Sequence, residues 1–596
     1  MDALPTIAAA GVATYFVLGR FVHIERVLKK VLPYGLAAGL YWRWVEYGQG
    51  HATSSLLVHA LAVAEAHAPS VAFVAGDAIV LLVTIHVAYY IFDRLRKARY
   101  GFSKKQAINK VGNAAMAALQ YIPFLQAKVR AEIAKIEHDI QHSFQGQGKS
   151  EAQFPKLYAL PEKGRNPDDV LATMTAMVHG EDKRWQDGLV SGAVYHGEAA
   201  HLELLNKASG LFAVANPLHA DLWPSVVRFE SEVIAMTASL MSNGSPDVCG
   251  ALTSGGTESI VLATKAHRDW FRHEHGITQP EVIAAVTAHA AIDKACDMFG
   301  IKLIKVPVDP VTFQVDLNAV RWNISANTIM LYSSAPNFPQ GTIDDIEALS
   351  AIATQYGVGL HVDACLGGFV LPFARMLGVK LPKFDFGLPG VTSMSCDTHK
   401  YGYASKGTSV VLYKNKAIRR FQYFAYSDWT GGLYATPTIA GSRPGALSAA
   451  AWASMVKMGK EGYMEKTRGI LDTVAVIKRG IQAMDDLYLL GDPLAMVLCF
   501  GSRSFNVLKV SDHMSKAGWS LNALQHPTSV HLCVTVRHIG KGDQFLAALR
   551  DAVKAVKDDP LGKLEGGTAI YGMASTMPAG PVEDILRIYT DATITL

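Results

Sequence analysis

The feature that most constrains the fold of this chain lies beyond Leu204, where short apolar segments alternate with stretches of helical spacing. This alternation is typical of a doubly wound α/β layer, because parallel strands need a crossover connection that is usually a helix. At 596 residues the chain is also too long for one ordinary domain. The pattern therefore predicts an α/β core, with ligands bound where the strands end.

The first hundred residues differ in composition and predict an association with a lipid bilayer. Residues 71–92 contain only Asp77 and His86 as clearly polar side chains, and these 22 residues are long enough to cross a hydrocarbon layer of about 30 Å. A basic run follows at Arg94, Arg96, Lys97, Arg99, Lys104 and Lys105. Because basic residues favour the cytosolic side, the rest of the chain is expected to face the cytosol. A buried core helix is the alternative, since Asp77 is costly in lipid.

The remainder of the chain has the composition of a soluble protein. Residues 122–140 place apolar side chains at helical spacing among charges. The 56 Lys and Arg nearly balance the 52 Asp and Glu, so no nucleic-acid partner is expected. Six cysteines lie far apart without a CxxC pair, which argues against a disulfide framework or a metal site and favours a reducing compartment.

The first stretch that suggests chemistry is residues 253–259, Thr-Ser-Gly-Gly-Thr-Glu-Ser, which lead into a helical pattern. Unpaired N–H groups at the positive end of a helix, together with the hydroxyls, suit a phosphate group. A glycine-rich turn with a Ser or Thr helix cap is the alternative interpretation. The motif by itself does not decide between a phosphate-binding loop and a capped turn.

Asp363 and Lys400 are the second and third candidates. Asp363 closes an apolar strand, and a carboxylate there would keep a pyridine nitrogen protonated. Lys400 follows Asp-Thr-His and is a candidate for a Schiff base, which requires loss of its proton near neutral pH. Lys406 is expected to supply the neighbouring positive charge that favours this loss, or to hold an anion. The alternatives are a turn-capping Asp and a surface Lys.

The fourth candidate is His289, which lies between the phosphate loop and Asp363 in the sequence. An aromatic ring at this position would stack on a cofactor ring, although a helix-capping histidine is an equally good interpretation of the residue alone. Phosphate loop, stacking histidine, aspartate and lysine, in this order on an α/β background, indicate a fold type I enzyme that uses pyridoxal 5'-phosphate.

At this level of detail the chain resembles the sphingosine-1-phosphate lyase family from about residue 120 to its C-terminus. The matching blocks are residues 185–188 (WQDG), 191–195 (SGAVY), 216–221 (NPLHAD), 253–259 (TSGGTES), 361–369 (HVDACLGGF), 397–413 (DTHKYGYASKGTSVVLY), 428–434 (DWTGGLY), 437–445 (PTIAGSRPG), 518–522 (GWSLN) and 571–574 (YGMA). General decarboxylases of this fold share the lysine and the aspartate but lack the block at 428–445. That block is the specific signal.

The resemblance implies an architecture and a place in the cell. It implies a mostly parallel central sheet in a large cofactor-binding domain at residues 211–450 and a smaller C-terminal α/β domain at residues 451–596. A helical segment at residues 106–210 would precede them. The first hundred residues cannot be matched to the family motif by motif, so the membrane-associated region at residues 1–105, with one transmembrane helix at 71–92, is predicted from the apolar run and the basic residues after it. The family also implies a homodimer with active sites at the subunit interface. Its eukaryotic members imply an endoplasmic reticulum membrane location with the catalytic part in the cytosol, and a chain from another source would be membrane-associated in the cytoplasm.

Site residues follow from the resemblance position by position. On the cofactor it implies Lys400 as the covalent attachment, Asp363 on the pyridine nitrogen, His289 against the ring, Gly256 and Thr257 on the phosphate, and His399 nearby. Around the polar end of the substrate it implies Tyr195, His219 and Lys406. The chain departs from the family at Ser405, where Pro is usual, at His526, where Phe is frequent, and at Gln340, where His or Tyr is common and which is therefore assigned no role.

The implied reaction is a retro-aldol cleavage of a phosphorylated long-chain base into a long-chain aldehyde and phosphoethanolamine. The base that removes the C3 hydroxyl proton is a lysine, a histidine or the cofactor phosphate, and the sequence does not choose among them. A pyridoxal-phosphate amino-acid decarboxylase is the alternative enzyme. A membrane scaffold built on an inactive enzyme fold is the alternative from another class, and the intact Lys400 and Asp363 argue against it.

Overall fold

The computed structural model describes residues 137–138, 156–179, 181, 183–560, 562–564, 568 and 579–595. The chain divides into two units, residues 1–94 and 95–596, and every described residue belongs to the second. No helix in the described part of the chain is long and apolar enough to span a membrane. The transmembrane helix expected at 71–92 lies outside the described residues, as does all of the helix expected at 122–140 except residues 137 and 138.

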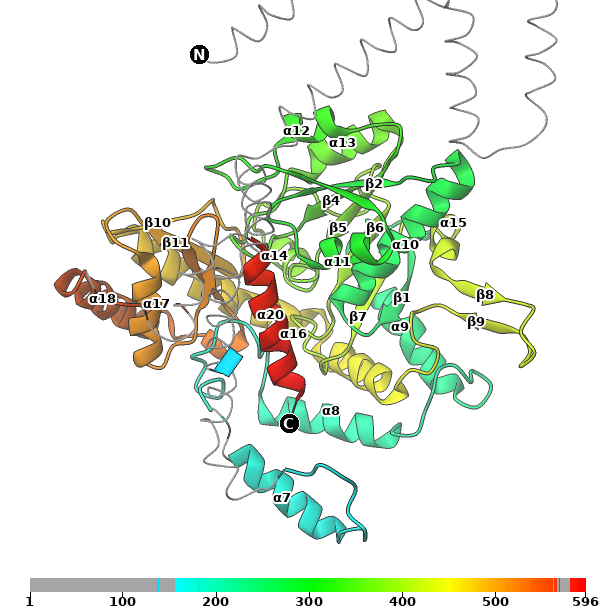
Figure 1. The fold of residues 1–596 in the computed structure, drawn as a ribbon, viewed down its shortest axis with the longest axis horizontal. Coiled ribbons are helices and arrows are strands. Elements are labelled where there is room, and N and C mark those ends of the chain that lie inside the picture. Colours follow the sequence, from blue (N-terminus) through cyan, green and yellow to red (C-terminus); the bar gives the residue numbers. More distant parts are fainter. Residues whose placement is uncertain are drawn as a thin grey trace, which may run out of the picture. The chain divides into compact units, whose positions relative to one another are not determined.

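The large domain is built on a seven-stranded sheet with the order β1-β7-β6-β5-β4-β2-β3 (Figure 1). Strands β6, β5, β4, β2 and β3 pair in parallel, whereas β7 is antiparallel to both of its neighbours. The strands are β1 (Cys249–Thr253), β2 (Glu281–Ala285), β3 (Lys302–Val306), β4 (Thr328–Ser334), β5 (Gly359–Asp363), β6 (Ser393–Cys396) and β7 (Ser409–Tyr413). The expectation of a mostly parallel central sheet is confirmed.

Most of the helices in this part of the chain connect or cover these strands, whereas α7 (Pro167–His179) has no buried residue and precedes the sheet in the sequence. The helices after α7 are α8 (Ala199–Leu211), α9 (Pro224–Met241), α10 (Gly256–His275), α11 (Ala291–Met298), α12 (Leu317–Asn323), α13 (Ile346–Tyr356), α14 (Leu371–Met376), α15 (Lys416–Arg419), the 3-10 turn η1 (Arg420–Gln422) and α16 (Gly445–Gln482). A hairpin of β8 (Phe424–Tyr426) and β9 (Tyr434–Thr436) extends from the domain, as the yellow ribbon in Figure 1 shows.

Local sequence signals explain where these elements begin and end. Helix α13 starts after Asp345, whose side chain accepts a hydrogen bond from the Ala348 N–H, and ends at Gly357 in the left-handed conformation (φ 64°) that glycine adopts without strain. The next strand, β5, has all five residues buried because helices cover both faces of a parallel sheet. The short connection from α13 to β5 and the burial of the whole strand fix the position of Asp363 at the strand end.

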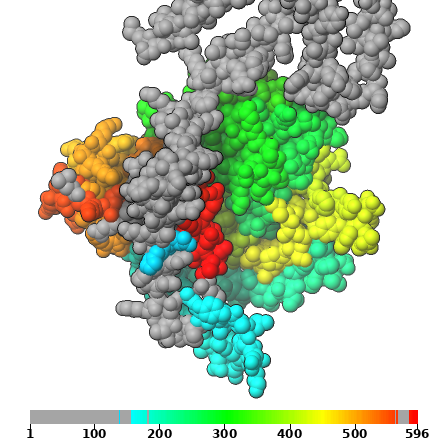
Figure 2. Space-filling model, viewed as in Figure 1, coloured from blue at the N-terminus to red at the C-terminus, as the bar shows by residue number. Residues whose placement is uncertain are grey.

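The C-terminal part contains a second, antiparallel sheet with the order β10-β11-β13-β12. Its elements, with the helices near it in sequence, are β10 (Leu487–Leu489), β11 (Val497–Ser502), α17 (Val507–Lys516), β12 (Asn522–Leu524), β13 (Ser529–Cys533), the 3-10 turn η2 (Val536–His538), α18 (Gly542–Asp558) and α20 (Ala579–Ile594). In Figure 2 this small domain, in orange, forms a lobe beside the green and yellow large domain. The domain boundaries expected between residues 210 and 211 and between residues 450 and 451 stay predictions.

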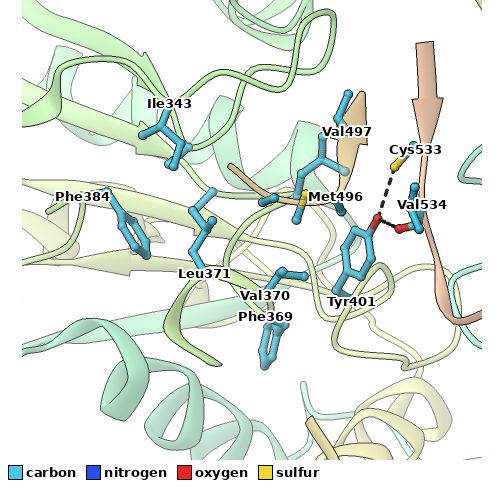
Figure 3. Close-up of a cluster of buried hydrophobic side chains, with 14 of the residues drawn as sticks. Ile343, Phe369, Val370, Leu371, Phe384, Tyr401, Met496, Val497, Cys533 and Val534 are labelled. Atoms are coloured by element: carbon cyan, nitrogen blue, oxygen red, sulfur yellow. Dashed lines mark hydrogen bonds between the residues drawn. The ribbon is translucent and has the colours of Figure 1, made fainter. Parts of the chain in front are cut away.

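One apolar core runs from the large domain into the small domain. It includes Phe369 and Leu371 from the large domain and Met496 and Val497 from the small domain, all buried (Figure 3). At the edge of this cluster the Tyr401 hydroxyl donates a hydrogen bond to the Val534 carbonyl at 2.7 Å. The residue that follows Lys400 is therefore fixed to the small domain.

Candidate active site

A cavity of about 440 Å³ opens at the carboxyl ends of β1, β4, β5 and β6. An open α/β sheet binds its ligands at this edge, because the loops that leave parallel strands meet there. The lining residues are Tyr195, Ser254, Gly255, Gly256, Thr257, Glu258, Ile260, His289, Ser334, Pro336, Phe338, Asp363, Cys365, Leu366, Asp397, His399 and Lys400. Seven of the nine predicted site residues, all except His219 and Lys406, are among them.

The N-terminus of α10 forms one wall of the cavity. The Glu258 carboxylate accepts hydrogen bonds from the Ser254 N–H at 2.6 Å and the Ile439 N–H at 3.0 Å, which holds the loop before the helix. A side chain at Gly256 would meet the Asp397 carboxylate and the Cys365 sulfur at 2.8 Å, so glycine is needed for this close approach. The free N–H groups of such a helix end attract an anionic group.

Asp363 lies at the end of β5 and is buried. Its Oδ2 accepts a 2.5 Å hydrogen bond from the Tyr332 hydroxyl, and its Oδ1 accepts from the Cys365 N–H at 3.0 Å and the Ser395 hydroxyl at 3.3 Å. Burial raises the pKa of Asp363, but these donors outweigh burial and hold its pKa below the ordinary value. The carboxylate is therefore charged, as a partner for a protonated ring nitrogen must be.

Lys400 forms an ion pair with Asp397, with 2.8 Å between Nζ and Oδ2. Burial lowers the pKa of Lys400, but the Asp397 charge raises it, and the net shift is well upward. The net pKa of Lys400 is thus raised and not lowered as expected, because the nearest ion is a carboxylate. Lys406 does interact with Lys400, but burial and the Lys400 charge lower the pKa of Lys406 itself.

Two histidines line the cavity, one from the loop after β2 and the other from the loop after β6. His289 is exposed to it, and its Nδ1 accepts a hydrogen bond from the Ala291 N–H at 3.1 Å. His289 thus accepts a hydrogen bond from the first residue of α11 while its ring stays exposed in the cavity, so capping the helix and stacking on a cofactor do not exclude each other. His399 is held by a 2.6 Å hydrogen bond between its Nδ1 and the Thr408 carbonyl, and burial lowers its pKa.

The three residues expected at the polar end of the substrate are only partly brought together. Lys406 Nζ lies 4.7 Å from the centre of the Tyr195 ring, and Tyr195 lines the cavity. His219 is exposed on the turn between α8 and α9, where its ring lies edge-on to Trp223 at 6.1 Å. Within one chain, His219 is therefore not part of the cavity wall.

The structure also adds residues that sequence analysis missed. Tyr332 carries the shortest hydrogen bond to Asp363, Asp397 pairs with Lys400, and Phe338 lines the cavity. Asp397 was visible in the Asp-Thr-His-Lys motif without an assigned role. Tyr332 gave no signal, because it reaches Asp363 only through the parallel pairing of β4 with β5.

Comparison with known proteins agrees with this fold. Residues 166–503 match the family described as the pyridoxal-dependent decarboxylase conserved domain. The fold is shared with a glutamate decarboxylase of Lactobacillus brevis (TM-score 0.60, 19% identity, covering 70% of this chain and 98% of that one). The fold and the site together define a pyridoxal-phosphate-dependent enzyme.

More similar proteins narrow the class. A sphingosine-1-phosphate lyase of Arabidopsis thaliana is 47% identical over 486 residues, which cover 80% of this chain and 88% of that protein. The solved structure of a sphingosine-1-phosphate lyase from Burkholderia pseudomallei has a TM-score of 0.67 at 43% identity, covering 68% of this chain and 95% of that one. The chain belongs to the sphingosine-1-phosphate lyase family.

Proposed function

We propose that this protein cleaves sphingosine 1-phosphate and related phosphorylated long-chain bases into a long-chain aldehyde and phosphoethanolamine. The observation that carries the proposal is the convergence of Lys400, Asp363 and the α10 N-terminus on one cavity, in a chain 47% identical to a protein named for this activity. The glutamate decarboxylase of Lactobacillus brevis and a tryptophan decarboxylase of Catharanthus roseus share the fold at 19% and 14% identity, so they support the fold alone.

The residues of the cavity fit pyridoxal phosphate. Gly256 leaves a space that a Cβ atom would fill, and Asp363 in the same cavity is kept charged. Among the described residues, Asp397 Oδ1 is buried without a hydrogen-bond partner, so the site has a polar atom still to be satisfied. Lys400 would attach the cofactor covalently, Asp363 would hold the ring nitrogen, His289 would lie against the ring, and Gly256 and Thr257 would bind the phosphate.

The proposed reaction breaks the bond between C2 and C3 of the substrate. The C3 hydroxyl loses its proton, C3 becomes the aldehyde carbon, and the electron pair left on C2 later takes up a proton to give phosphoethanolamine. Bound pyridoxal phosphate supplies the electron sink for this pair. His399 is a cavity group able to take up a proton: the Thr408 carbonyl only accepts, so Nδ1 carries the hydrogen and Nε2 of the neutral ring is left as an acceptor.

The substrate phosphate is proposed to bind Tyr195 and Lys406, which are already in contact. We propose that His219 joins them from the second subunit of a homodimer, because it lies away from the cavity of its own chain. Support for a subunit interface comes from the segment that holds β8 and β9. Its exposed large apolar side chains are Phe424, Tyr426, Trp429 and Leu433.

Residues 1–105 are proposed to anchor the enzyme in the endoplasmic reticulum membrane through a helix at 71–92, with the catalytic part in the cytosol. The apolar run and the basic residues that follow it support this proposal. A chain that lacks residues 1–105 should partition into the soluble fraction of a cell lysate and keep its activity on detergent-dispersed substrate. Soluble behaviour of the full-length chain would contradict the anchor.

The activity itself is tested with purified protein, pyridoxal phosphate and sphingosine 1-phosphate. Stoichiometric release of a long-chain aldehyde and phosphoethanolamine is expected, and Lys400→Ala should abolish both the turnover and the visible absorbance of the bound cofactor. Release of carbon dioxide from an amino acid, with no aldehyde from the phosphorylated base, would instead identify a decarboxylase.

A further inference from the structure

Phe338 is an unusual member of the cavity wall. Its side chain is 40% exposed, whereas the other apolar side chains of the lining, Ile260 and Leu366, are 1% and 6% exposed and already packed in the core. Pro336 is also buried. Phe338 is therefore the large apolar side chain of the described lining that still presents a free surface, and a ring of this size gains much from a further apolar contact.

The position of Phe338 is fixed by its neighbours. The centroids of the His531 and Phe338 rings lie 4.6 Å apart with the ring planes at 71°, and His531 Nδ1 donates a hydrogen bond to the Pro339 carbonyl at 3.0 Å. On the other side, the Asn337 side chain accepts hydrogen bonds from the Gln340 N–H at 2.9 Å and the Gly341 N–H at 3.1 Å. A ring that keeps part of its surface exposed while its loop is fixed on both sides is suited to contact a ligand without rearrangement.

The distribution of chemistry around the cavity indicates what that ligand part is. Asp363, Asp397, Lys400 and the α10 N-terminus supply charged and polar groups to the lining, and these groups suit the cofactor and not a hydrocarbon chain. We infer that Phe338 is a specificity-determining residue whose ring receives the hydrocarbon chain of the substrate, and that His531 is the positioning residue behind it. This inference rests on the proposed function, because only a long-chain substrate supplies such a chain.

The test compares phosphorylated bases of increasing chain length on the wild type and on Phe338→Ala. For the longest chain the variant should lose about tenfold in kcat/KM, mainly through KM, and the loss should shrink as the chain is shortened. Phe338→Trp narrows the same space, so it should shift the preference toward shorter chains. Tyr356→Ala removes another aromatic ring of similar exposure (44%) outside the cavity lining and serves as the matched control.

The outcomes separate this inference from the proposed function. If the wild type cleaves none of the phosphorylated bases, the proposed function is wrong. If the wild type cleaves them but Phe338→Ala loses the same factor at every chain length, Phe338 does not contact the chain. A uniform loss accompanied by a change of oligomeric state in sedimentation would show that Phe338 contacts a second subunit, which also overturns the inference.

The positioning role of His531 is tested by a double-mutant cycle. His531→Asn keeps a donor for the Pro339 carbonyl but removes the ring that contacts Phe338. It should therefore reproduce part of the chain-length effect of Phe338→Ala, and the double variant should lose little more than Phe338→Ala alone. Binding of short and long alkyl phosphates, measured by calorimetry on the holoenzyme, provides a readout independent of turnover. If the losses in kcat/KM of the two single variants add up in the double variant, His531 does not position Phe338 and has a structural role only.

Discussion

Asp363 shows how a single residue acquires its chemistry from partners on neighbouring strands. An isolated buried carboxyl would become neutral, and a neutral group could not hold a protonated ring nitrogen. The Tyr332 hydroxyl on β4, the Ser395 hydroxyl on β6 and the Cys365 N–H prevent this by donating to it. The charge of this residue is thus a property of three adjacent strands.

Removal of one donor should therefore change the pH dependence of the enzyme. The pKa of Asp363 is held below its ordinary value, so the carboxylate stays charged as the pH falls. In Tyr332→Phe this pKa rises, and kcat/KM should fall earlier on the acid side, with a loss of about tenfold near pH 5. Steady-state assays across the pH range check this, with cofactor content measured in parallel. An unchanged acid limb would mean that the hydroxyl does not set the charge.

The positive charge of Lys406 should matter for binding the phosphate group of the substrate. Its contact with the Tyr195 ring leads us to expect a role in binding the substrate phosphate. Lys406→Ala should weaken kcat/KM for a phosphorylated base by about ten- to a hundredfold and affect the same base without phosphate far less. Lys416→Ala, at another exposed lysine, is the matched control. Equal losses on both substrates would leave Lys406 with a structural role only.

Sequence reasoning found the residues whose role depends on order along the chain and missed those whose role depends on pairing in space. Asp363, Lys400 and His289 were predicted from the order of their motifs along the chain and Gly256 from the family resemblance, and the structure brings all four to one cavity. The partner of Lys400 was not anticipated, because the proximity of Asp397 depends on how the loop folds after β6. Phe338 was missed since an exposed aromatic has no signature in a single sequence.

At the scale of elements, the start of α10 depends on a close contact between two loops. Gly256→Ala would place a methyl group 2.8 Å from the Asp397 carboxylate, which is buried and paired with Lys400 and so cannot move freely. Overpacking of this kind costs roughly 1–3 kcal/mol, so cofactor affinity should fall about tenfold or more. Equilibrium titration with pyridoxal phosphate measures this. Gly210→Ala, which has no neighbouring atom within 4 Å, should bind normally.

The alternation of segments predicted the layered fold but not the direction of every strand. Strand β7 is antiparallel to β6, although all five of its residues are buried like those of the parallel strands. A fully buried strand has the same apolar pattern in either direction, so direction is decided by the connection. The turn that carries Lys400 joins β6 to β7 without a crossover helix, and this reversal places the lysine at the ligand edge of the sheet.

At the scale of the whole molecule, the described residues include several histidines that are neutral because they are buried. Burial lowers the pKa of His361 to about 3 and that of His267 and three others to about 4. The three others are His196, His531 and His538. As the pH falls below about 6.5, the unfolded chain binds protons that the folded chain does not, so the free energy of unfolding decreases.

Acid should therefore destabilise the protein well above the range in which carboxylates titrate. Each such histidine removes up to about 1.4 kcal/mol per pH unit between its unfolded and folded pKa values, so the melting temperature should drop steeply from about pH 7 to about pH 5. Differential scanning calorimetry checks this. His267→Gln should make the dependence shallower, whereas His275→Gln, at an exposed histidine on the same helix, should not. Equal slopes in all three proteins would contradict the argument.

The contacts of β13 and of Val534 just after it have a consequence for biosynthesis. The Phe338 ring, the Ser191 hydroxyl and the Tyr401 hydroxyl have their partners in residues 531–534, which follow all the cavity-lining residues in the sequence. On the ribosome, the residues that line the cavity emerge long before this strand. A nascent chain that stops after residue 503 would contain the entire matched decarboxylase domain and every lining residue, yet lack the strand that fixes the lysine loop. Premature termination there should yield a protein that cannot retain its cofactor.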